Sequence, residues 1–470
     1  MVEIGKSVMR FSWAITVFGA QQAADLVTGK KRETASAAFD AVSFTAEKHL
    51  GDTLTGVYRA GDEMQQQILQ GKMPGLPDSA VNAIGQMVLK QPMMAAGVRA
   101  SIPPLVWSLS SLYRKIPPKI AKLEAENKMW IMKLVEETGH EIEKPGKMAS
   151  LLKLVEDCYA MGEFPAVWAV EGVGHAWADV VYKRGEVPKN LLTGPEGDET
   201  PSKAMTMLHA GIGLSFAERR MHKVSPNIPH EDLRRIIEGF VADCKGSSRP
   251  GYTGAAYESL GLVVRYFHGP AMCKKVGAAA SDIDPRIAGW FWRGVGRSIY
   301  FSTQNMTPSS ASPWPGIDLC DSEAVDEASR RAMHAGRTWA TTVVNMRHPR
   351  IFATILEHYG ERFLKDDSCA NGVMSSVIMR HDTTPDTELV EKYRNYVPTN
   401  AKVREFWREL VAEPIERALG KYYPVLRAHD RLDEVFRYQD LGALVQELEK
   451  APNPAGTDGS RKPRGTSPRA

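Results

Sequence analysis

Glycine-centred apolar stretches recur along the middle of this chain, and they constrain its fold more than any other feature. The clearest one spans residues 292–301, where Gly294 and Gly296 are flanked by apolar residues. The first small residue of each stretch falls at positions 172, 211, 259, 294 and 336, at steps of 39, 48, 35 and 42 residues. A step of about 40 residues accommodates two helices and their turns. The spacing therefore predicts an array of helical repeats.

The recurrence of glycine inside helices needs a physical reason, because each internal glycine costs about 1 kcal/mol relative to alanine. The interpretation that we favour is close approach, in which two helix backbones cross where side chains are missing. The alternative is that the glycines open onto a shared groove that holds a ligand or a partner chain.

Apolar residues outside these stretches also follow the helical period. Leu233, Ile236, Ile237, Phe240 and Val241 fit the i, i+3, i+4, i+7, i+8 template in full. The sequence contains no succession of alternating apolar and polar runs that would predict strands. We therefore predict an all-α fold, a helical repeat array of TPR-like or solenoid-like hairpins with an N-terminal amphipathic helical region.

Composition divides the chain into three regions. Residues 1–112 are an apolar and amphipathic helical region, and residues 113–450 are the helical repeat domain. The repeat domain contains the five glycine-centred stretches within 165–345, followed by further helices. Residues 451–470 are dominated by Pro, Gly, Ser and Arg, so we expect a disordered tail.

The N-terminal region has two interpretations. Its uncharged run, residues 11–24, is shorter than the roughly 20 apolar residues of a membrane-spanning helix, so we expect no integral membrane segment. The amphipathic pattern that follows suits helices packed on the repeat domain. It also suits helices that lie on a membrane or lipid surface, which makes peripheral membrane contact through residues 1–112 the alternative.

The charge of the chain and its cysteines limit the expected class of binding partner and the expected redox compartment. The formal net charge is +3, and the C-terminal tail holds four Lys or Arg against one Asp. The rest of the chain is therefore near neutral, which disfavours nucleic acid as a partner. Five widely spaced cysteines without a CxxC pair favour a reducing cytoplasm over a disulfide framework. We predict neither a cofactor nor a metal site.

A set of polar residues recurs beside the small positions. Glu171 and His175 are four apart and share a helix face. If the array curves, the set converges on its concave side, where His and carboxylate groups bind metals or shuttle protons. The interpretation that we favour is ordinary ion pairing between repeats, such as Glu258 with Arg293. The candidate catalytic residues are Glu171, His175, His209, Glu258, Arg293, Arg297 and His334.

The motifs of common enzyme classes are missing from the sequence. It has no phosphate-binding P-loop, no His-Glu-x-x-His and no Gly-x-Ser-x-Gly nucleophile elbow. Cys369 lies near Asp366 and Asp367, whose negative charge would raise the pKa of its thiol and keep it unreactive.

Several glycine-centred stretches resemble a bacterial family of unknown function that is found with enediyne biosynthesis genes. Residues 170–178 are similar to the family's first motif, residues 210–217 to its second, and residues 294–301 to its fourth, a Gly-x-Gly-Arg-Ser before an aromatic pair. The third motif, Asp-Gly-Tyr-Gly-Phe-His in the family, departs at residues 257–261. The resemblance covers residues 165–345 and implies an accessory role in specialised metabolism, with no known reaction.

The function that we predict is that of a non-catalytic helical-repeat accessory protein of specialised metabolism, of the enediyne or polyketide type. It binds a partner protein or an apolar small molecule, in the cytoplasm or at a membrane surface. The alternative is an enzyme or chaperone-like auxiliary that acts on a polyketide or lipid intermediate through a polar groove. A polar pocket around Glu171, His209, Glu258 and Arg293 favours the alternative, whereas a filled repeat axis favours the accessory protein.

Overall fold

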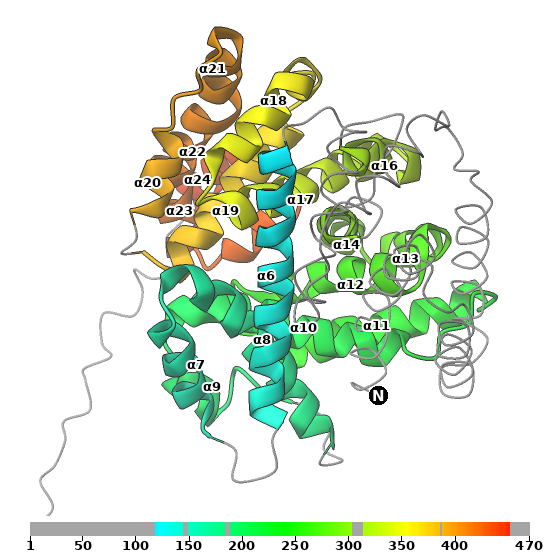
Figure 1. Cartoon of the computed structure of the whole chain (residues 1–470). Helices are drawn as coiled ribbons and strands as arrows, with labels where there is room; N and C mark the ends of the chain where they lie inside the picture. The colour runs from blue at the N-terminus through cyan, green and yellow to red at the C-terminus, as the bar shows by residue number, and fades with distance from the viewer. Residues whose placement is uncertain (1–117, 144–148, 184–188, 303–313, 386–387, 452–470) are drawn as a thin grey trace, which may run out of the picture. The chain divides into compact units, whose positions relative to one another are not determined.

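Helices account for all of the regular structure in the described residues. The computed structural model describes residues 118–143, 149–183, 189–302, 314–385 and 388–451 (Figure 1). These ranges contain no strand, which confirms the predicted all-α fold. The predicted N-terminal region, 1–112, and the tail from 452 onward lie outside the described residues.

Contacts divide the chain into two compact units, of which the second carries nearly all of the described residues. The first unit comprises residues 1–126 and 306–313, and the second comprises residues 127–305 and 314–470. The only described part of the first unit is the beginning of α6 (Pro118–Glu143).

Six helices form the centre of the second unit, and each packs most extensively on its neighbours among them in chain order. These central helices are α8 (Glu163–Lys183), α10 (Met205–Met221), α12 (Thr253–Phe267), α14 (Pro285–Phe301), α17 (Glu327–Asn345) and α19 (Ser368–Thr383). The last of them, α19, also contacts α10. Helices that are far apart in sequence therefore meet in the interior.

Most successive central helices are separated by one further helix. These intervening helices are α11 (His230–Ser247), α13 (Gly269–Ile283), α16 (Pro315–Glu323) and α18 (Pro349–Phe363). Between α8 and α10 the structure instead has the short α9 (Pro195–Glu199) and a 3-10 turn (Ser202–Ala204). Because the intervening segments differ in kind, the repeat interpretation stays a prediction.

Helices at both ends of the unit pack on this centre. α7 (Leu151–Ala160) packs on α8 (Figure 1). The C-terminal helices are α20 (Leu389–Arg394), α21 (Ala401–Trp407), α22 (Glu413–Arg417), α23 (Tyr423–Ala428) and α24 (Leu441–Lys450). Of these, α20 and α22 contact α19, α21 packs on α18, and α23 and α24 pack on each other. The last helix ends at Lys450, where the predicted repeat domain also ends.

Most of the recurrent glycines lie where central helices cross, whereas Gly172 of α8 faces α6, with its Cβ position 2.9 Å from the carbonyl oxygen of Val135. A Cβ atom at Gly261 of α12 would lie 1.9 Å from the carbonyl oxygen of Phe291 in α14, and one at Gly294 of α14 would lie 2.0 Å from that of Glu258 in α12. No real Cβ atom tolerates such a distance. The two glycines thus allow the two backbones to touch, which confirms the packing interpretation at this crossing.

The same arrangement holds at the other crossings of central helices. A Cβ atom at Gly211 would lie 2.2 Å from the carbonyl oxygen of Glu171, and one at Gly336 would lie 1.9 Å from that of Arg293. The sequence analysis missed a sixth member of the series, Gly372 of α19, whose Cβ atom would lie 2.5 Å from the carbonyl oxygen of Ala335. Its second position is Met374 rather than a small residue, so the signature is incomplete there.

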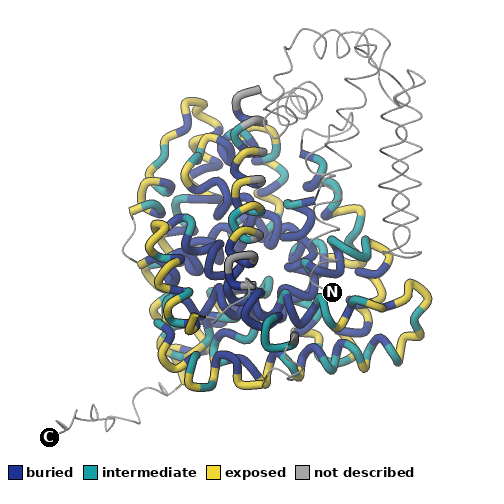
Figure 2. The backbone as a smooth tube through the Cα atoms, turned by 60° about the horizontal axis from the view of Figure 1, so that its bottom comes forward, coloured by how far each residue is buried: buried dark blue, intermediate teal, exposed yellow. Residues whose placement is uncertain are grey.

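Burial on all sides explains why α10 shows a weak apolar period. α10 buries residues on all of its sides, including His209, Gly211, Ile212 and Gly213 in succession around the helix. α11, in contrast, buries mainly the stripe that includes Leu233, Ile237, Phe240 and Val241, as predicted from its period. Figure 2 shows the buried backbone concentrated in the interior, with exposed stretches on the outer helices. A helix buried on all sides needs no single apolar face.

Local signals set several helix boundaries. The Asp284 side chain accepts a hydrogen bond from the Arg286 N–H and Pro285 takes the first helical position, so α14 begins as predicted. At α17 the Asp326 side chain accepts from the Ser329 N–H, and the Ser329 hydroxyl bonds back to the cap backbone. These caps satisfy N–H groups that the first helical turn leaves free.

Two π-helical turns, residues 408–412 and 418–422, join α21, α22 and α23 into one continuous helical segment. Each turn ends two residues before a proline, Pro414 or Pro424. A proline removes one backbone N–H and crowds the carbonyl four residues earlier, and a widened turn relieves this conflict. Trp407 and Leu410 remain buried across the first turn, on the apolar face expected from the sequence.

No helix in the described ranges combines the length and the apolar character that crossing a bilayer requires.

Trp314, which the sequence places at the end of a Ser- and Pro-rich segment, is fully buried at the start of α16. Its ring lies edge-on to His358 and Tyr359 of α18. It therefore anchors the beginning of α16 to the core.

Candidate functional site

Four of the seven candidate residues meet in the interior of the second unit. Glu171 comes from α8, Glu258 from α12, and Arg293 and Arg297 from α14. The Arg297 Nη2 atom donates to Glu171 Oε1 at 2.5 Å, and its Nη1 atom donates to Glu258 Oε2 at 3.4 Å. Arg293 donates to Glu258 Oε1, and also to the Ser375 hydroxyl of α19 at 2.9 Å. We call these five residues the central polar cluster.

The central polar cluster is removed from solvent. The side chains of Arg293 and Glu258 are 0% exposed, and those of Arg297 and Glu171 are 3% and 4% exposed. Trp339 covers both guanidinium groups, with its ring centroid 4.9 Å from Arg297 Cζ and 5.6 Å from Arg293 Cζ. Two carboxylates and two guanidinium groups thus compensate one another in a low-dielectric environment.

The pKa values of the two arginines shift in opposite directions in this environment. Burial lowers the pKa of Arg293, and the charge of Glu258 offsets this only in part. Burial also opposes the charge on Arg297, but the carboxylates of Glu171 and Glu258 outweigh it and raise its pKa. Both directions leave the guanidinium groups protonated at neutral pH. Neither arginine therefore releases a proton near pH 7.

This geometry matches the interpretation that the sequence favoured, ion pairs between helices, including the predicted pair of Glu258 with Arg293. The alternative interpretation, a polar site on the concave side of the array, requires these groups to face solvent. They are buried instead. Chemically, the cluster can hold α8, α12, α14 and α19 in register, because breaking one pair would leave a buried charge without a partner.

The three candidate histidines do not join the central polar cluster. His175 lies one turn from Glu171 on α8, but its Nε2 atom lies 3.2 Å from Glu218 of α10. His209 of α10 is fully buried: its Nδ1 atom lies 2.6 Å from the Met205 carbonyl oxygen, and its Nε2 atom accepts from the Arg249 N–H at 3.0 Å.

These contacts determine the state of His209. A carbonyl oxygen can only accept and a backbone N–H can only donate, so Nδ1 carries the proton and Nε2 carries the lone pair. Burial lowers the pKa of His209 to about 4. The neutral ring stacks on Tyr252 at a centroid distance of 5.3 Å. His209 is thus a satisfied core residue.

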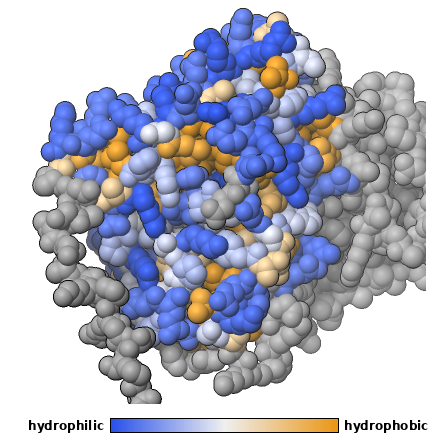
Figure 3. All heavy atoms as spheres, turned by 90° about the vertical axis from the view of Figure 1, so that its left-hand side faces the viewer, coloured by the Kyte–Doolittle hydropathy of each residue, from blue (hydrophilic) through white to orange (hydrophobic). Residues whose placement is uncertain are grey.

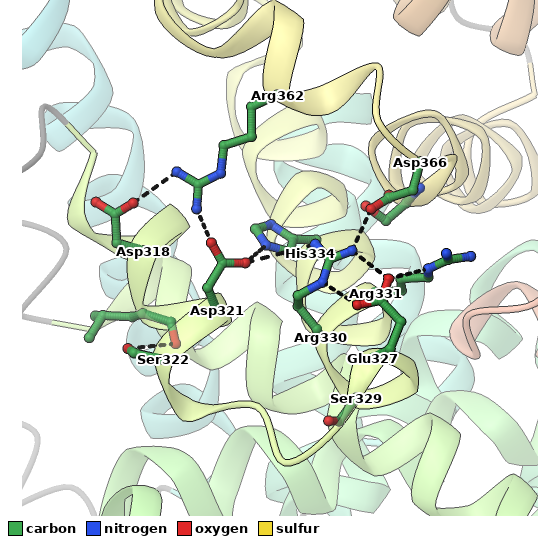
Figure 4. Close-up of polar contacts among 12 residues, drawn as sticks. Asp318, Asp321, Ser322, Glu327, Ser329, Arg330, Arg331, His334, Arg362 and Asp366 are labelled. Atoms are coloured by element: carbon green, nitrogen blue, oxygen red, sulfur yellow. Dashed lines mark hydrogen bonds and ion pairs between the residues drawn. The ribbon is translucent and has the colours of Figure 1, made fainter.

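His334 belongs to a separate charged cluster on α16, α17 and α18 (Figure 4). Its Nε2 atom lies 2.7 Å from Asp321 Oδ1, and Arg362 donates to Asp321 Oδ2 and to Asp318. Arg330, one turn earlier on α17, joins Asp366 and Glu327 at 2.7 Å each. Burial raises the pKa of Asp321, but His334 and Arg362 outweigh it, so the net shift is downward. The cluster is a chain of ion pairs that ties three helices together.

The cysteines are unreactive as well as unpaired. All five are free and buried. Burial, supported by Asp366 and opposed by Thr338 and Arg337, raises the pKa of Cys369 to about 12. The predicted direction is confirmed, but burial rather than the neighbouring aspartates is the larger cause. A thiol with such a pKa carries almost no thiolate at pH 7.

The described residues contain no candidate metal site. No group of three or more His, Cys, Asp or Glu side chains there is arranged to hold a metal ion.

Sequence reasoning missed two buried arginines, Arg337 of α17 and Arg380 of α19. Both are 0–1% exposed, and none of their guanidinium nitrogens has a hydrogen-bond partner among the residues that the structure describes. Arg337 follows Gly336 directly in the chain and was therefore close to a predicted site residue, whereas Arg380 lies outside all five signatures. Unpaired buried guanidinium groups are rare, because an isolated charge loses its hydration without compensation.

Comparison with known proteins identifies no relative: no protein-family model, curated protein or solved structure matches this chain.

Proposed function

We propose that this protein is a non-catalytic helical accessory protein that binds a partner protein or an apolar ligand. The observation that carries the proposal is the burial of the central polar cluster. Glu171, Glu258, Arg293 and Arg297 are at most 4% exposed and bond to one another, so the interior offers no solvent-facing acid or base. The enzyme alternative requires such groups to contact a substrate.

The setting follows from the sequence resemblance. The glycine-centred motifs are similar to those of the bacterial family found with enediyne biosynthesis genes. On that basis we assign the accessory role to bacterial specialised metabolism, with an enediyne-like or polyketide-like product. The protein acts in the cytoplasm.

The described surface is compatible with binding a partner. Figure 3 shows apolar side chains gathered in places among hydrophilic ones on one face of the molecule. Isolated apolar side chains also reach solvent elsewhere, such as Met161, at 53%, and Val397, at 69% exposed. Single exposed apolar residues are ordinary on proteins, so they do not identify the partner.

The apolar region 1–112 is the part that we propose to contact a membrane or lipid surface peripherally. Its run of Trp13, Val17 and Phe18 among small residues supplies apolar area, and neither large net charge nor a spanning length accompanies it. Binding of this kind depends on buried apolar area and only weakly on salt.

Vesicle flotation of the full chain tests this role. With zwitterionic vesicles, the unmodified protein is expected to float at both low and high salt. Replacing Trp13 and Phe18 with Asp should abolish flotation, whereas replacing Gln21 and Gln22 with Asp, in the same run, should not. If the unmodified, folded protein stays at the bottom, membrane contact is refuted and the ligand must be a soluble partner. Equal loss in both variants would show a general charge effect.

A further inference from the structure

Two arginines lie against one aromatic ring at an edge of the second unit. The ring belongs to Phe164, the second residue of α8. Its centroid lies 3.9 Å from Arg347 Cζ and 5.5 Å from Arg380 Cζ. Trp130 of α6 stacks on Phe164 at 5.7 Å and also lies 5.0 Å from Arg347 Cζ. Two positive groups thus share a small aromatic surface built by separate parts of the chain.

Arg380 is buried there without an ion pair to any described residue. It is 1% exposed, and none of its three guanidinium nitrogens has a hydrogen-bond partner in the described part of the chain. Burial, with a smaller contribution from the charge of Arg347, lowers the pKa of Arg380 to about 10. In the central polar cluster, in contrast, each buried arginine is matched by a carboxylate. A buried guanidinium group has five N–H donors. Without an acceptor in contact, it lacks the anion that would complete an ion pair.

No carboxylate of the described residues pairs with Arg380. Glu163 is the acid whose charge acts most strongly on Arg380, but it is exposed, and no ion pair within the described residues joins the two. Arg347 is exposed and forms no ion pair there either. The positive end of the α8 dipole lies at the same place, because Phe164 is in the first turn of that helix.

We propose that Arg380 and Arg347 bind an oxyanion, the phosphate or carboxylate group of a small molecule, beside the ring of Phe164. Guanidinium forks recognise both groups through paired, charge-assisted hydrogen bonds. The rings of Phe164 and Trp130 provide an apolar wall, so an acid with an aromatic body fits better than a small hydrophilic one. This site is separate from the central polar cluster and specifies a ligand chemistry that the proposed accessory role leaves open.

Calorimetric titration of the full chain with sodium phosphate, acetate and benzoate, at constant ionic strength, tests the proposal. The unmodified protein should bind phosphate, and it should bind benzoate more tightly than acetate. Arg347→Gln, at an exposed position, should fold normally and weaken binding by about tenfold or more, because one charge-assisted donor is lost. Arg350→Gln, a nearby exposed arginine of α18, is the matched control and should bind like the unmodified protein.

Glu163→Gln distinguishes the proposal from its simplest competitor, in which Glu163 itself pairs with Arg380 in solution. Removing the carboxylate should tighten anion binding if the site awaits a ligand. If Glu163 is the true partner, the variant should instead melt at a lower temperature without any gain in binding.

Three results would overturn the site: no binding of any of the three anions, equal losses in Arg347→Gln and Arg350→Gln, or flotation of the Trp13→Asp, Phe18→Asp variant with phosphatidic acid vesicles without binding of the free anions. The last result would place the anion in a lipid surface rather than in a small molecule. The calorimetric titrations do not depend on the Trp13 region, so their failure leaves the proposed accessory role untouched.

Discussion

At the scale of single residues, Arg297 is the most constrained group in the protein. It bridges the carboxylates of Glu171 and Glu258, which lie 126 and 39 residues earlier in the chain. Each of these groups has lost its hydration and is compensated within the central polar cluster. The net free energy gained from these ion pairs is therefore small. Removing one member is costly, however, because it leaves another charge buried without a partner.

Replacing Arg297 with Met should destabilise the protein by about 3–5 kcal/mol, because Glu171 would remain buried without a counter-charge. Urea unfolding followed by circular dichroism measures this loss. The matched control is Arg286→Met, which breaks the exposed pair of Arg286 with Asp284 and should cost about 1 kcal/mol or less. Equal losses in the two variants would mean that the central polar cluster contributes no more than a surface ion pair.

At the scale of elements, backbone contact between helices explains the recurrent glycines. The crossings of α12 with α14 and of α14 with α17 are the tightest. A Cβ atom at Gly261, Gly296 or Gly336 would lie 1.9 Å from a carbonyl oxygen of the opposite helix. Glycine lowers the helix propensity of the segment. In return, it allows the two helix backbones to approach more closely than any residue with a Cβ atom would permit. The signature thus marks crossings of helices rather than a ligand groove.

Gly261→Ala should force α12 away from α14, because its Cβ atom would otherwise lie 1.9 Å from the Phe291 carbonyl oxygen. Overpacking of this kind costs about 1–3 kcal/mol or more. Gly246→Ala in α11 is the control: nothing lies within 4 Å of its Cβ position, so the higher helix propensity of Ala should stabilise the protein by about 0.5–1 kcal/mol. Thermal unfolding compares the two, and a stabilising Gly261→Ala would refute the close crossing.

At the scale of the whole second unit, the C-terminal segment fastens onto helices from the middle of the chain. Asp433 lies in the 3-10 turn Leu432–Phe436, and its side chain accepts from the Gly254 N–H at 3.3 Å. Its carbonyl oxygen accepts from Trp290 Nε1 at 3.2 Å. Burial, with a contribution from Glu434, raises the pKa of Asp433 to about 6. This docking contact is therefore sensitive to pH.

The native state binds a proton at Asp433 below about pH 6, whereas the unfolded chain does so only near pH 3.9. The native state thus holds more protons between these values, so the contribution of Asp433 to stability falls as pH rises from about 4 to 6. Asp433→Asn should be more stable than the unmodified protein at pH 7 and nearly equal to it at pH 4, by urea unfolding. Exposed Glu447→Gln should show no such difference, and a pH-independent effect of Asp433→Asn would contradict the assignment.

The sequence by itself determined the helical class, many helix boundaries and the apolar faces of the outer helices, because these depend on residues within a turn or two of one another. The cap at Asp284, the stripe of α11 and the end of α24 at Lys450 are examples. It also indicated the pair of Glu258 with Arg293, since both stand at the same position of neighbouring signatures.

Only the tertiary structure decided which polar residues meet and which are left unpaired. Arg297 reaches Glu171 across 126 residues, and Ser375 joins from a helix whose signature is incomplete. The candidate histidines are bonded elsewhere. His209 and His334 stand two residues before the first small position, one residue earlier than Glu258 and Arg293 do, so they project from a different side of the helix. Arg380 is unremarkable in the sequence, and its unpaired state arises only because α8 and α19 bury it against Phe164. Burial and partnership are properties of the packed helices, and no local pattern encodes them.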